Sequence, residues 1–440
     1  MSVQIRKLGE VLNCITDQGV GYVLVGESTI QLKEDLSGDV DIVVPPESIE
    51  DPTKFIQKIC ESCSVICVQI LQHEVTAFYF VVTWKEDGEY QFLKLDICSD
   101  YYRDARFLLG ANRLLSNRYK EPESGFYYPA PEDNFLYYLI KKVDKGSISE
   151  SKFDFLVELF SAGNSSDIHG ALMEFWPEEE ADRLLRLFDQ RSLAQFKASL
   201  ISFQQKLLSG TIKKKRAIIA ELRRFLSRVT KPTGIWIAIY GPDGCGKSSV
   251  IEQLRPKMIP YFRRIDESHF RPYVGWSREK DGSPISSPHE VPDRSFLVSV
   301  LKLLYYWADY VIGYFFKVFP RCVRSSFYIF DRYYDDICID PKRYAYGGPR
   351  LFLSFGGFIV PKPELIFCLD AEPEILQARK KEVSFEECLR QRNAYRSLVQ
   401  QLPNGHVVDA SQPLEDVVRD VQGYLLTYMA TRTKQRMKKC

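Results

Sequence analysis

The sequence predicts an α/β protein of several domains, and three observations support that fold class. From Ile235 onward, short apolar runs without alternation recur between loops and helical patterns, which is typical of strands buried on both faces of a parallel sheet. Residues 1–105 mix helical patterns with short strands and a hairpin signal, whereas residues 106–230 carry mainly helical periodicity. With 440 residues, of which 45% are hydrophobic, the chain is long enough for two or three domains with separate cores.

Residues 1–105 form the first predicted domain. Its expected elements are a helix at Val3–Gln18, strands at Tyr22–Gly26 and Asp39–Val44, a helix at Lys54–Cys63, and a hairpin of Thr76–Trp84 with Glu89–Ile97 around Glu86-Asp87-Gly88.

Residues 106–230 are predicted to be a helical extension and linker. Their last part is basic, with Lys213–Arg216 followed by Arg223, Arg224 and Arg228. The solvated face of a linker helix explains this stretch, and a phosphate-binding or nucleic-acid-binding patch is the alternative.

Lys231–Gly234 interrupts the helical pattern and marks a domain boundary. We therefore assign residues 231–430 to a third domain and residues 431–440 to a basic tail, which we expect to be frayed. The expected strands of the third domain are Ile235–Tyr240, Phe327–Phe330, Leu365–Leu369 and His406–Val408.

Composition excludes several classes of protein. The chain has 59 Lys and Arg against 58 Asp and Glu, a formal net charge of +1, so no global field favours nucleic acid as a partner. Its 11 cysteines are too sparse for a disulfide scaffold at this length, and its first residues contain no apolar signal-peptide core. We therefore expect a globular protein of the reducing cytoplasm.

The longest apolar stretch runs from Phe296 to Phe319 and contains Lys302, Asp309 and Lys317. Charges at these positions are costly inside a bilayer, so we do not expect a membrane-spanning helix. The stretch is predicted to be a largely buried, aromatic-rich helix, with contact on one membrane surface as the alternative.

A phosphate-binding loop is the strongest motif in the sequence. Gly241–Ser248 fits GxxxxGK[ST], follows an apolar strand and precedes a predicted helix at Ser249–Met258. Such a loop wraps phosphates with backbone amides, while Lys247 reaches the β- and γ-phosphates and the Ser248 hydroxyl ligates Mg²⁺. We expect ATP and Mg²⁺ to be held by Gly241, Asp243, Gly244, Cys245, Gly246, Lys247, Ser248 and Ser249.

A second polar motif, Asp331-Arg332-Tyr333, ends the next apolar strand. A carboxylate at the carboxyl end of a parallel strand lies where ligands bind, so Asp331 is a candidate Mg²⁺ ligand. Arg332 could form a forked contact with an anionic group of the acceptor.

These motifs resemble the thymidylate kinase family, together with Leu369-Asp370-Ala-Glu-Pro-Glu-Ile-Leu-Gln-Ala-Arg379-Lys380-Lys381. The resemblance implies a five-stranded parallel sheet with helices on both faces. It also implies that Arg379 belongs to a mobile lid that closes on the transferring phosphate, that Asp243 lies near the acceptor phosphate, and that Arg390 or Arg392 lies on the following helix. Lys247, Asp331, Arg332 and Arg379 are then the catalytic residues.

The acceptor is less well defined by the sequence. Tyr261–Arg324 shows no thymidine-site pattern, but loops around Arg271 and Arg343 combine cations with aromatic residues, as an anionic acceptor site requires. We therefore expect the acceptor to be a nucleoside monophosphate or another small metabolite. His269 is a weaker candidate for substrate binding, because a single loop histidine is more often a surface or packing residue.

A third motif lies near the N-terminus. Asp39 and Asp41 fall on one face of a predicted strand, and Asp96 lies in a later strand. This pattern resembles the nucleotidyltransferase superfamily with the polymerase-β-like fold, in which three such acids hold two Mg²⁺ ions. The resemblance extends to substrate contacts at Gly26 and Ser28, but Glu27 departs from it by placing an acid near the nucleotide phosphates.

The preferred hypothesis is a kinase of small molecules joined to a nucleotidyltransferase-like module. One alternative is a nucleotidyltransferase that modifies protein or RNA and is regulated by the ATP-binding module. A second alternative is a protein that binds nucleotide at both sites without turnover. The sequence leaves homodimer formation open.

Overall fold

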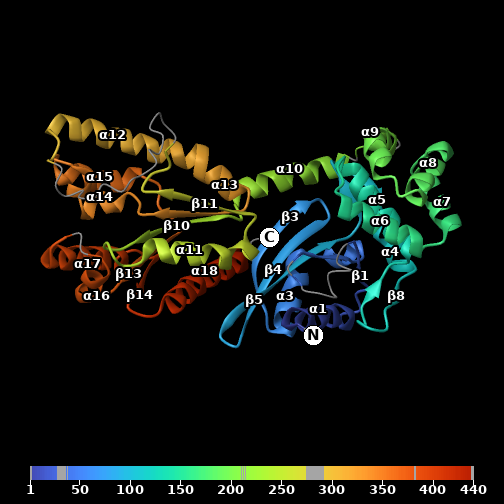
Figure 1. Cartoon of the computed structure of the whole chain (residues 1–440), viewed down its shortest axis with the longest axis horizontal. Coiled ribbons are helices and arrows are strands. Elements are labelled where there is room, and N and C mark those ends of the chain that lie inside the picture. Colours follow the sequence, from blue (N-terminus) through green and yellow to red (C-terminus); the bar gives the residue numbers. More distant parts are fainter. Residues whose placement is uncertain are drawn as a thin grey trace. The chain divides into compact units, whose positions relative to one another are not determined.

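A computed structural model describes residues 2–26, 36, 38–209, 211, 213, 215–273, 292–380 and 383–437. By backbone contacts the chain forms two units (Figure 1). Unit 1 comprises Met1–Ser227 with Ala430–Cys440, and unit 2 comprises Arg228–Met429. The finer division at residue 105 stays a prediction.

Unit 1 is built on a five-stranded mixed sheet in the order β1-β2-β5-β4-β3. Strands β2 and β5 run parallel, and the other neighbours are antiparallel. Helices α1 and α3 pack on the sheet around a core that includes Leu12, Ile56 and Phe80. The elements are α1 (Val3–Asp17), β1 (Val23–Leu24), β2 (Val40–Val43), η1 (Pro46–Ile49), α3 (Pro52–Cys63), β3 (Ile66–Glu74), β4 (Ala77–Glu86) and β5 (Glu89–Cys98).

The remainder of unit 1 is mainly helical, and its centre is α5. This helix begins at Pro131, ends at Lys145, is capped by Gly146 in a left-handed conformation, and buries residues on most of its circumference. Its aromatic residues pack in a second core with Phe153 and Phe188. The elements are β6 (Tyr101–Arg103), β7 (Arg106–Leu109), α4 (Ala111–Ser116), β8 (Tyr119–Lys120), β9 (Tyr127–Tyr128), α5 (Pro131–Lys145), α6 (Glu150–Ala162), α7 (Ser165–Met173), α8 (Glu178–Asp189), α9 (Leu193–Ser209) and α10 (Lys215–Thr230).

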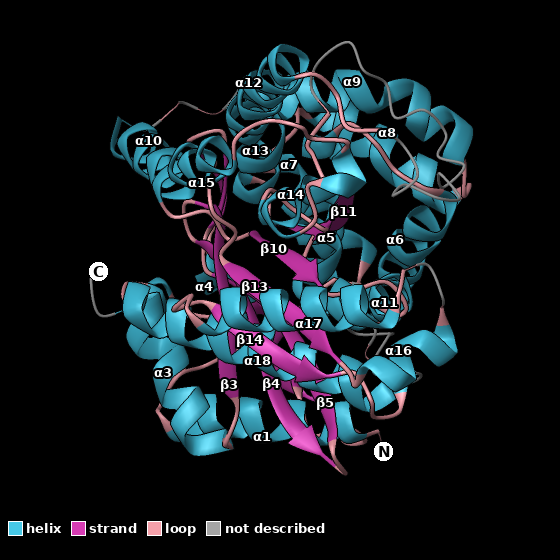
Figure 2. Ribbon diagram, turned by 90° about the vertical axis from the view of Figure 1, so that its left-hand side faces the viewer, coloured by secondary structure: helices cyan, strands magenta, loops and turns pink. Residues whose placement is uncertain are grey.

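Unit 2 contains the expected parallel sheet of five strands, in the order β11-β12-β10-β13-β14. Helices cover both of its faces, with α12 and α15 over one face and α11 and α18 over the other (Figures 1 and 2). The strands are β10 (Ile235–Tyr240), β11 (Arg264–His269), β12 (Ser326–Asp331), β13 (Leu365–Asp370) and β14 (Gly405–Asp409).

The helices of unit 2 follow the strands in the order that a parallel sheet requires. They are α11 (Lys247–Met258), η2 (Ile259–Tyr261), α12 (Phe296–Gly313), η4 (Tyr314–Val318), α13 (Phe319–Val323), α14 (Asp335–Ile339), η5 (Lys342–Tyr344), α15 (Arg350–Ile359), α16 (Pro373–Arg379), α17 (Phe385–Gln400) and α18 (Leu414–Met437).

Two expectations about local structure were wrong. The apolar stretch is helical from Phe296 to Val323 and long and apolar enough to cross a membrane, but only about a third of its most apolar window is buried. One stripe, with Leu303 and Tyr310, lies in the core, and the opposite stripe is exposed. The tail was also expected to fray, whereas α18 continues to Met437 with Thr433 buried.

Candidate functional site

The loop after β10 has the backbone that the motif requires. Gly241, Gly244 and Gly246 have φ angles of 145°, 85° and 90°, in a region that other residues rarely adopt. A Cβ on Gly241 would lie 2.7 Å from the carbonyl oxygen of Leu369, and one on Gly244 would lie 2.7 Å from that of Leu376. Glycine at these positions therefore lets the loop pack closely against β13 and α16.

Lys247 is the first residue of α11 and is 8% exposed. Its Nζ donates to the carbonyl oxygens of Gly241 at 2.8 Å and Pro242 at 3.0 Å, and lies 3.6 Å from Cys245 Sγ. The amine is thus held inside the loop. Ser248 and Ser249 follow it in the first turn of α11, where backbone amides and the helix dipole attract phosphate.

Asp331 ends β12 and lies opposite Ile239 of β10, next to the loop. His269 Nδ1 lies 3.4 Å from its Oδ2, whereas its buried Oδ1 has no hydrogen-bond partner among the described residues. Burial acts to raise the pKa of Asp331, but the hydrogen bond from His269 and the charge of Lys247 outweigh it, so the pKa lies below its ordinary value. An ionised carboxylate with one unsatisfied oxygen beside a phosphate loop fits a Mg²⁺ ligand.

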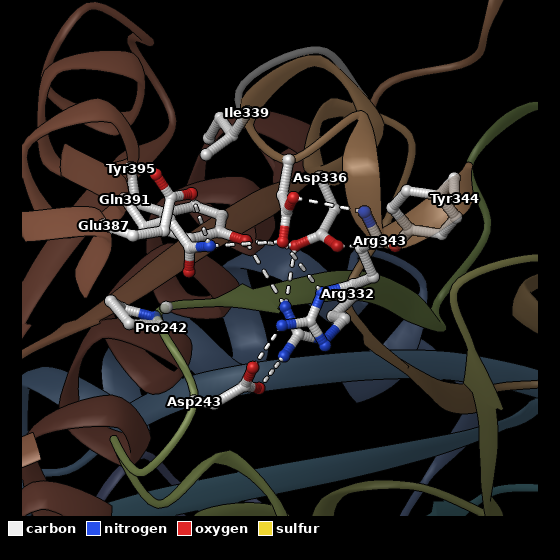
Figure 3. A network of polar contacts seen from close by, with 12 residues as sticks. Pro242, Asp243, Arg332, Asp336, Ile339, Arg343, Tyr344, Glu387, Gln391 and Tyr395 are labelled. Atoms are coloured by element: carbon white, nitrogen blue, oxygen red, sulfur yellow. Dashed lines mark hydrogen bonds and ion pairs between the residues drawn. The ribbon is translucent and has the colours of Figure 1, made fainter. Parts of the chain in front are cut away.

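Arg332 is buried in a network of polar contacts (Figure 3). Its backbone has a φ of 67°, which turns the chain directly after β12. Nη1 lies 2.9 Å from Asp336 Oδ1 and donates to the Tyr395 hydroxyl at 3.3 Å, while Nη2 contacts Asp243 of the phosphate loop. The guanidinium therefore links the loop to α14 and α17.

Asp243 lies between two arginines, Arg332 and Arg343. Burial acts to raise the pKa of Asp243, but the two guanidinium groups and Lys247 lower it by more. The pKa therefore lies far below its ordinary value, and the carboxyl group is ionised. Arg343 also lies 3.2 Å from Asp340 Oδ2, which accepts from Gln391 at 3.2 Å. The predicted residues Asp243, Arg332 and Arg343 are thus brought together.

Arg379 lies at the end of α16, and its Nη1 donates to the carbonyl oxygen of Ala410 at 2.9 Å. It lines a cavity of about 190 Å³ that reaches the phosphate loop at Gly246 and Ser249. This placement beside the start of α11 suits contact with the nucleoside end of a bound nucleotide. Lys381, quoted with it in the lid motif, lies outside the described residues.

Arg390 and Arg392 both lie on α17, as the resemblance implied. Arg390 pairs with Glu387, and Arg392 lies 2.7 Å from Asp370 Oδ1. Both guanidinium groups are therefore engaged by carboxylates of unit 2.

Arg271 is also buried, and it is separate from the Arg332 network. Its Nη1 lies 3.1 Å from Asp309 Oδ2, and its guanidinium lies 4.5 Å from the ring centroid of Tyr306. Lys302 is close by, and burial together with the charges of Arg294 and Arg271 lowers its pKa to about 8. This cluster has more cationic than acidic groups and can attract an anion.

Unit 1 brings the three predicted acids to one pocket of about 370 Å³. Asp41 of β2 is the register partner of Asp96 of β5, and Asp39 precedes β2. The Tyr79 hydroxyl donates to Asp39 Oδ1 at 2.8 Å, and Lys94 Nζ lies 3.7 Å from the same atom. Across the described ranges, no three His, Cys, Asp or Glu side chains lie close enough together to hold a metal ion, so Asp39 would have to turn to join the other two.

Lys141 of α5 balances the pair of acids, with its Nζ 3.4 Å from Asp41 Oδ1. Burial, followed by repulsion from Asp41, raises the pKa of Asp96 to about 8. Two carboxylates that repel each other are a donor set that a divalent cation stabilises, so the residues fit Mg²⁺. Lys142, Lys145 and Lys152 line the same pocket and give it a basic side.

Gly26 lies at the edge of this pocket. Its φ is 70°, its amide donates to Asn134 Oδ1 at 3.2 Å, and a Cβ would lie 3.4 Å from Asp41 Oδ2. The backbone can therefore approach the acids closely only with glycine. Ser28, the other predicted contact, lies outside the described residues.

Sequence reasoning missed several residues of both sites. Asp336 and Tyr395 complete the Arg332 network, and Lys141 faces the acids of unit 1. His269 was named as a candidate for substrate binding, but its pairing with Asp331 was not predicted. The spacing of Lys141 and Lys145 by four residues, which places both on one face of α5, was a signal that could have identified the basic side of the pocket.

Comparison with known proteins gives matches that cover part of the chain. A probable thymidylate kinase of Pyrobaculum aerophilum is 30% identical over 198 residues, which is 42% of this chain and 93% of that protein. Thymidylate kinases of Xanthomonas euvesicatoria and Xanthomonas campestris are 25% and 26% identical, over 46% of this chain and 88% of each relative. No protein-family model matches the chain.

Proposed function

The chain belongs to the thymidylate kinase family through a match that covers 42% of its length, and from that premise we propose that unit 2, which contains the phosphate loop, is a nucleoside-monophosphate kinase that uses ATP and Mg²⁺. The main support is the arrangement of Lys247 and Asp331 around the loop. Lys247 would leave the loop carbonyls for the β- and γ-phosphates, and the unsatisfied Oδ1 of Asp331 would face the metal, directly or through water.

The metal would neutralise charge on the phosphates, and the side chains of this unit would position them. Ser248 lies in the first turn of α11, where its hydroxyl can ligate Mg²⁺. Phosphoryl transfer depends mainly on positioning and charge stabilisation, which a preformed loop and buried cations provide.

The acceptor phosphate would bind beside Asp243, Arg332 and Arg343. The two guanidinium groups contact the same carboxylate, that of Asp243, and Arg332 also forms an ion pair with Asp336. An incoming phosphate could share these forked donors. Arg271 and Lys302 form a second cationic cluster that could contact the rest of the acceptor.

An acceptor screen tests this function. ATP consumption would be measured with each nucleoside monophosphate and with sugar or polyol phosphates. We expect one class of acceptor to stimulate turnover, and Lys247→Ala to lower that rate by roughly 10²–10³-fold. Lys257→Ala, on the same helix, is the matched control and should keep activity. Equal stimulation in the Lys247→Ala protein would contradict the proposal.

We further propose that unit 1 is a nucleotidyltransferase. One observation favours it: a single pocket has Asp39, Asp41 and Asp96 on one side and Lys142 and Lys145 among its other lining residues. Such a pocket suits a nucleoside triphosphate, because the acids can hold Mg²⁺ while the lysines attract the phosphates. The acceptor of the nucleotide would be a hydroxyl group that the metal activates.

Pyrophosphate release from each nucleoside triphosphate, with and without added acceptors, tests this second function. The double variant Asp39→Asn/Asp41→Asn should abolish release and leave ATP-dependent phosphoryl transfer unchanged. Asp17→Asn, at the exposed end of α1, is the control. Loss of both reactions in the double variant would argue against independent sites.

A further inference from the structure

The helix that runs from Phe296 to Val323 is apolar on two opposite faces. The inner face packs in the core of unit 2 through Leu303, Tyr306 and Tyr310. The outer face is exposed, with Leu301 at 58%, Phe315 at 59% and Phe316 at 77%. A helix that is hydrophobic all round is normally buried or in contact with lipid, so the outer face needs a partner that the core does not provide.

Helix α15 extends this surface. Its outer residues include Leu351, which is 75% exposed, and Phe358, which is 88% exposed. α12 and α15 pack side by side, and the rings of Trp307 and Phe355 lie 5.9 Å apart between them (Figure 1). We call this surface the outer apolar face, made of Phe296, Leu297, Val298, Leu301, Leu304, Tyr305, Ile312, Phe315, Phe316, Leu351, Phe352, Phe355, Phe358 and Ile359.

The charges in the two helical segments are almost all positive. Residues 296–323 and 350–359 contain Lys302, Lys317, Arg321 and Arg350. Their single acid, Asp309, is 4% exposed and paired with Arg271. Arg321 is paired with Asp266, and Lys317 donates to the carbonyl oxygen of Pro272. The net positive charge of the segments therefore comes from Lys302, Lys317 and Arg350. An apolar surface that spans two helices marks an interaction site, and this excess of cations favours an anionic partner.

We propose that the outer apolar face binds the surface of an anionic lipid bilayer. The helix lies on the surface and does not span it, because its inner face belongs to the protein core. Aromatic and aliphatic side chains enter the boundary between headgroups and acyl chains, while nearby lysines and arginines approach lipid phosphates.

A second copy of the chain fits the same face less well. A two-fold contact pairs a surface with itself, so a dimer through this face would bring like cations together. An anionic bilayer instead neutralises them. Charge complementarity therefore favours lipid over self-association.

Helix α10 shows the same chemistry in a different part of the chain. Its exposed residues Ile218, Leu222 and Phe225 form an apolar stripe with helical spacing. The helix also carries five cationic residues and one acid, Glu221, which pairs with Arg224. A basic amphipathic helix is typical of binding to a membrane surface, and this observation supports lipid as the partner independently of α12 and α15.

Vesicle flotation of the full chain tests the proposal without any assay of catalysis. The probes are vesicles of phosphatidylcholine alone and vesicles that also contain phosphatidylglycerol. We expect the wild-type protein to float with the anionic vesicles, and to bind less at high salt because the charges are screened. Binding to neutral vesicles should be weaker.

The double variant Phe316→Ser/Phe358→Ser removes the two most exposed aromatic residues of the face. We expect it to lower the partition coefficient for anionic vesicles by about tenfold, because binding scales with buried apolar area. Ile259→Ser, which changes another exposed apolar residue of unit 2, should bind like the wild type. Circular dichroism and ATP binding check that all the variants are folded.

Two results would overturn the proposal. One is a wild-type protein that floats with neither kind of vesicle. The other is vesicle binding that Phe316→Ser/Phe358→Ser leaves unchanged. A sedimentation result would also overturn it: if the wild type is a dimer that this double variant dissociates, the outer apolar face is a contact between copies of the chain and not a lipid-binding surface.

Discussion

The acidic residues of the two polar sites have opposite electrostatic surroundings. In unit 2 the half-buried Asp243 and the buried Asp336 are each paired with arginine, and the pKa of each lies below its ordinary value. In unit 1 the acids Asp41 and Asp96 face each other across two strands, and the pKa of Asp96 is raised. The acids of the Arg332 network are therefore each neutralised by arginine before a ligand binds, whereas Asp41 and Asp96 share the nearby cation Lys141, and an added cation would stabilise them further.

This difference also separates the two expected modes of phosphate binding. The loop of unit 2 uses backbone amides and a helix N-terminus, which need no change of ionisation. The pocket of unit 1 would use carboxylates through a metal and lysines directly. Variants of a paired acid, of a nucleotide contact and of a repelled acid test the comparison separately.

The largest expected effect is on the stability of unit 2. Asp336→Asn removes the acid that holds Arg332 and leaves a buried guanidinium with Asp243 as its remaining carboxylate. Breaking a buried ion pair costs about 3–5 kcal/mol, and chemical denaturation would show this loss. The control Asp416→Asn breaks an exposed pair with Arg419 and should cost less than about 1 kcal/mol. Equal losses would show that the network does not stabilise the unit.

The next effect concerns nucleotide binding. Arg379→Ala should raise the KM for ATP by about tenfold and change kcat much less, because Arg379 lines the cavity next to Gly246 and Ser249 and the loss of one good contact is worth about 1–2 kcal/mol. Steady-state kinetics separate the two parameters. A fall in kcat with an unchanged KM would instead support the lid role that the sequence resemblance implied.

The smallest effect is a pH dependence in unit 1. The pKa of Asp96 is raised from 3.8 to about 8, so between these values the folded carboxyl holds a proton that the unfolded chain has released. Stability therefore falls as pH rises through this window and levels off above it. Asp96→Asn removes this titration. With divalent metal removed by a chelator, the thermal unfolding midpoint of the variant should therefore fall by a few degrees less than that of the wild type between pH 5 and pH 9.

A matched control and added metal sharpen this measurement. Asp17→Asn changes an exposed acid and should keep the wild-type slope. Mg²⁺ should stabilise the wild type at pH 9, since a ligand that binds only the folded state raises its stability, but should stabilise Asp96→Asn less. Identical slopes in all three proteins would show that Asp96 does not titrate in this range.

The sequence was sufficient for the elements with strong patterns. Four of the five strands of unit 2 were predicted. Strands β10, β12 and β13 are short apolar runs buried on both faces, whereas β14 was predicted from Val407-Val408 although only Val408 of it is buried. Strand β11 was missed because Arg264–His269 is almost entirely polar and lies at the sheet edge. That omission hid the pairing of His269 with Asp331, which are direct register partners on neighbouring strands.

The side-chain networks could not be predicted from the sequence. Arg332 contacts Asp243, which is 89 positions away in the sequence. The sequence alone does not distinguish Arg332 from the other arginines of the chain as the partner of Asp243. Which one is buried beside the loop depends on the left-handed turn at Arg332 and on the packing of α17. The exposure of α12 was missed for a related reason, because apolar residues on both faces of a helix do not reveal which face packs.

The position of Lys247 has a consequence for selectivity. Its amine is bound to the carbonyl oxygens of Gly241 and Pro242, so the loop contains an internal competitor for its own ligand. An incoming anion must bind the amine more strongly than these two carbonyl oxygens do. We therefore expect inorganic phosphate to be a poor inhibitor and polyphosphate chains to be strongly preferred.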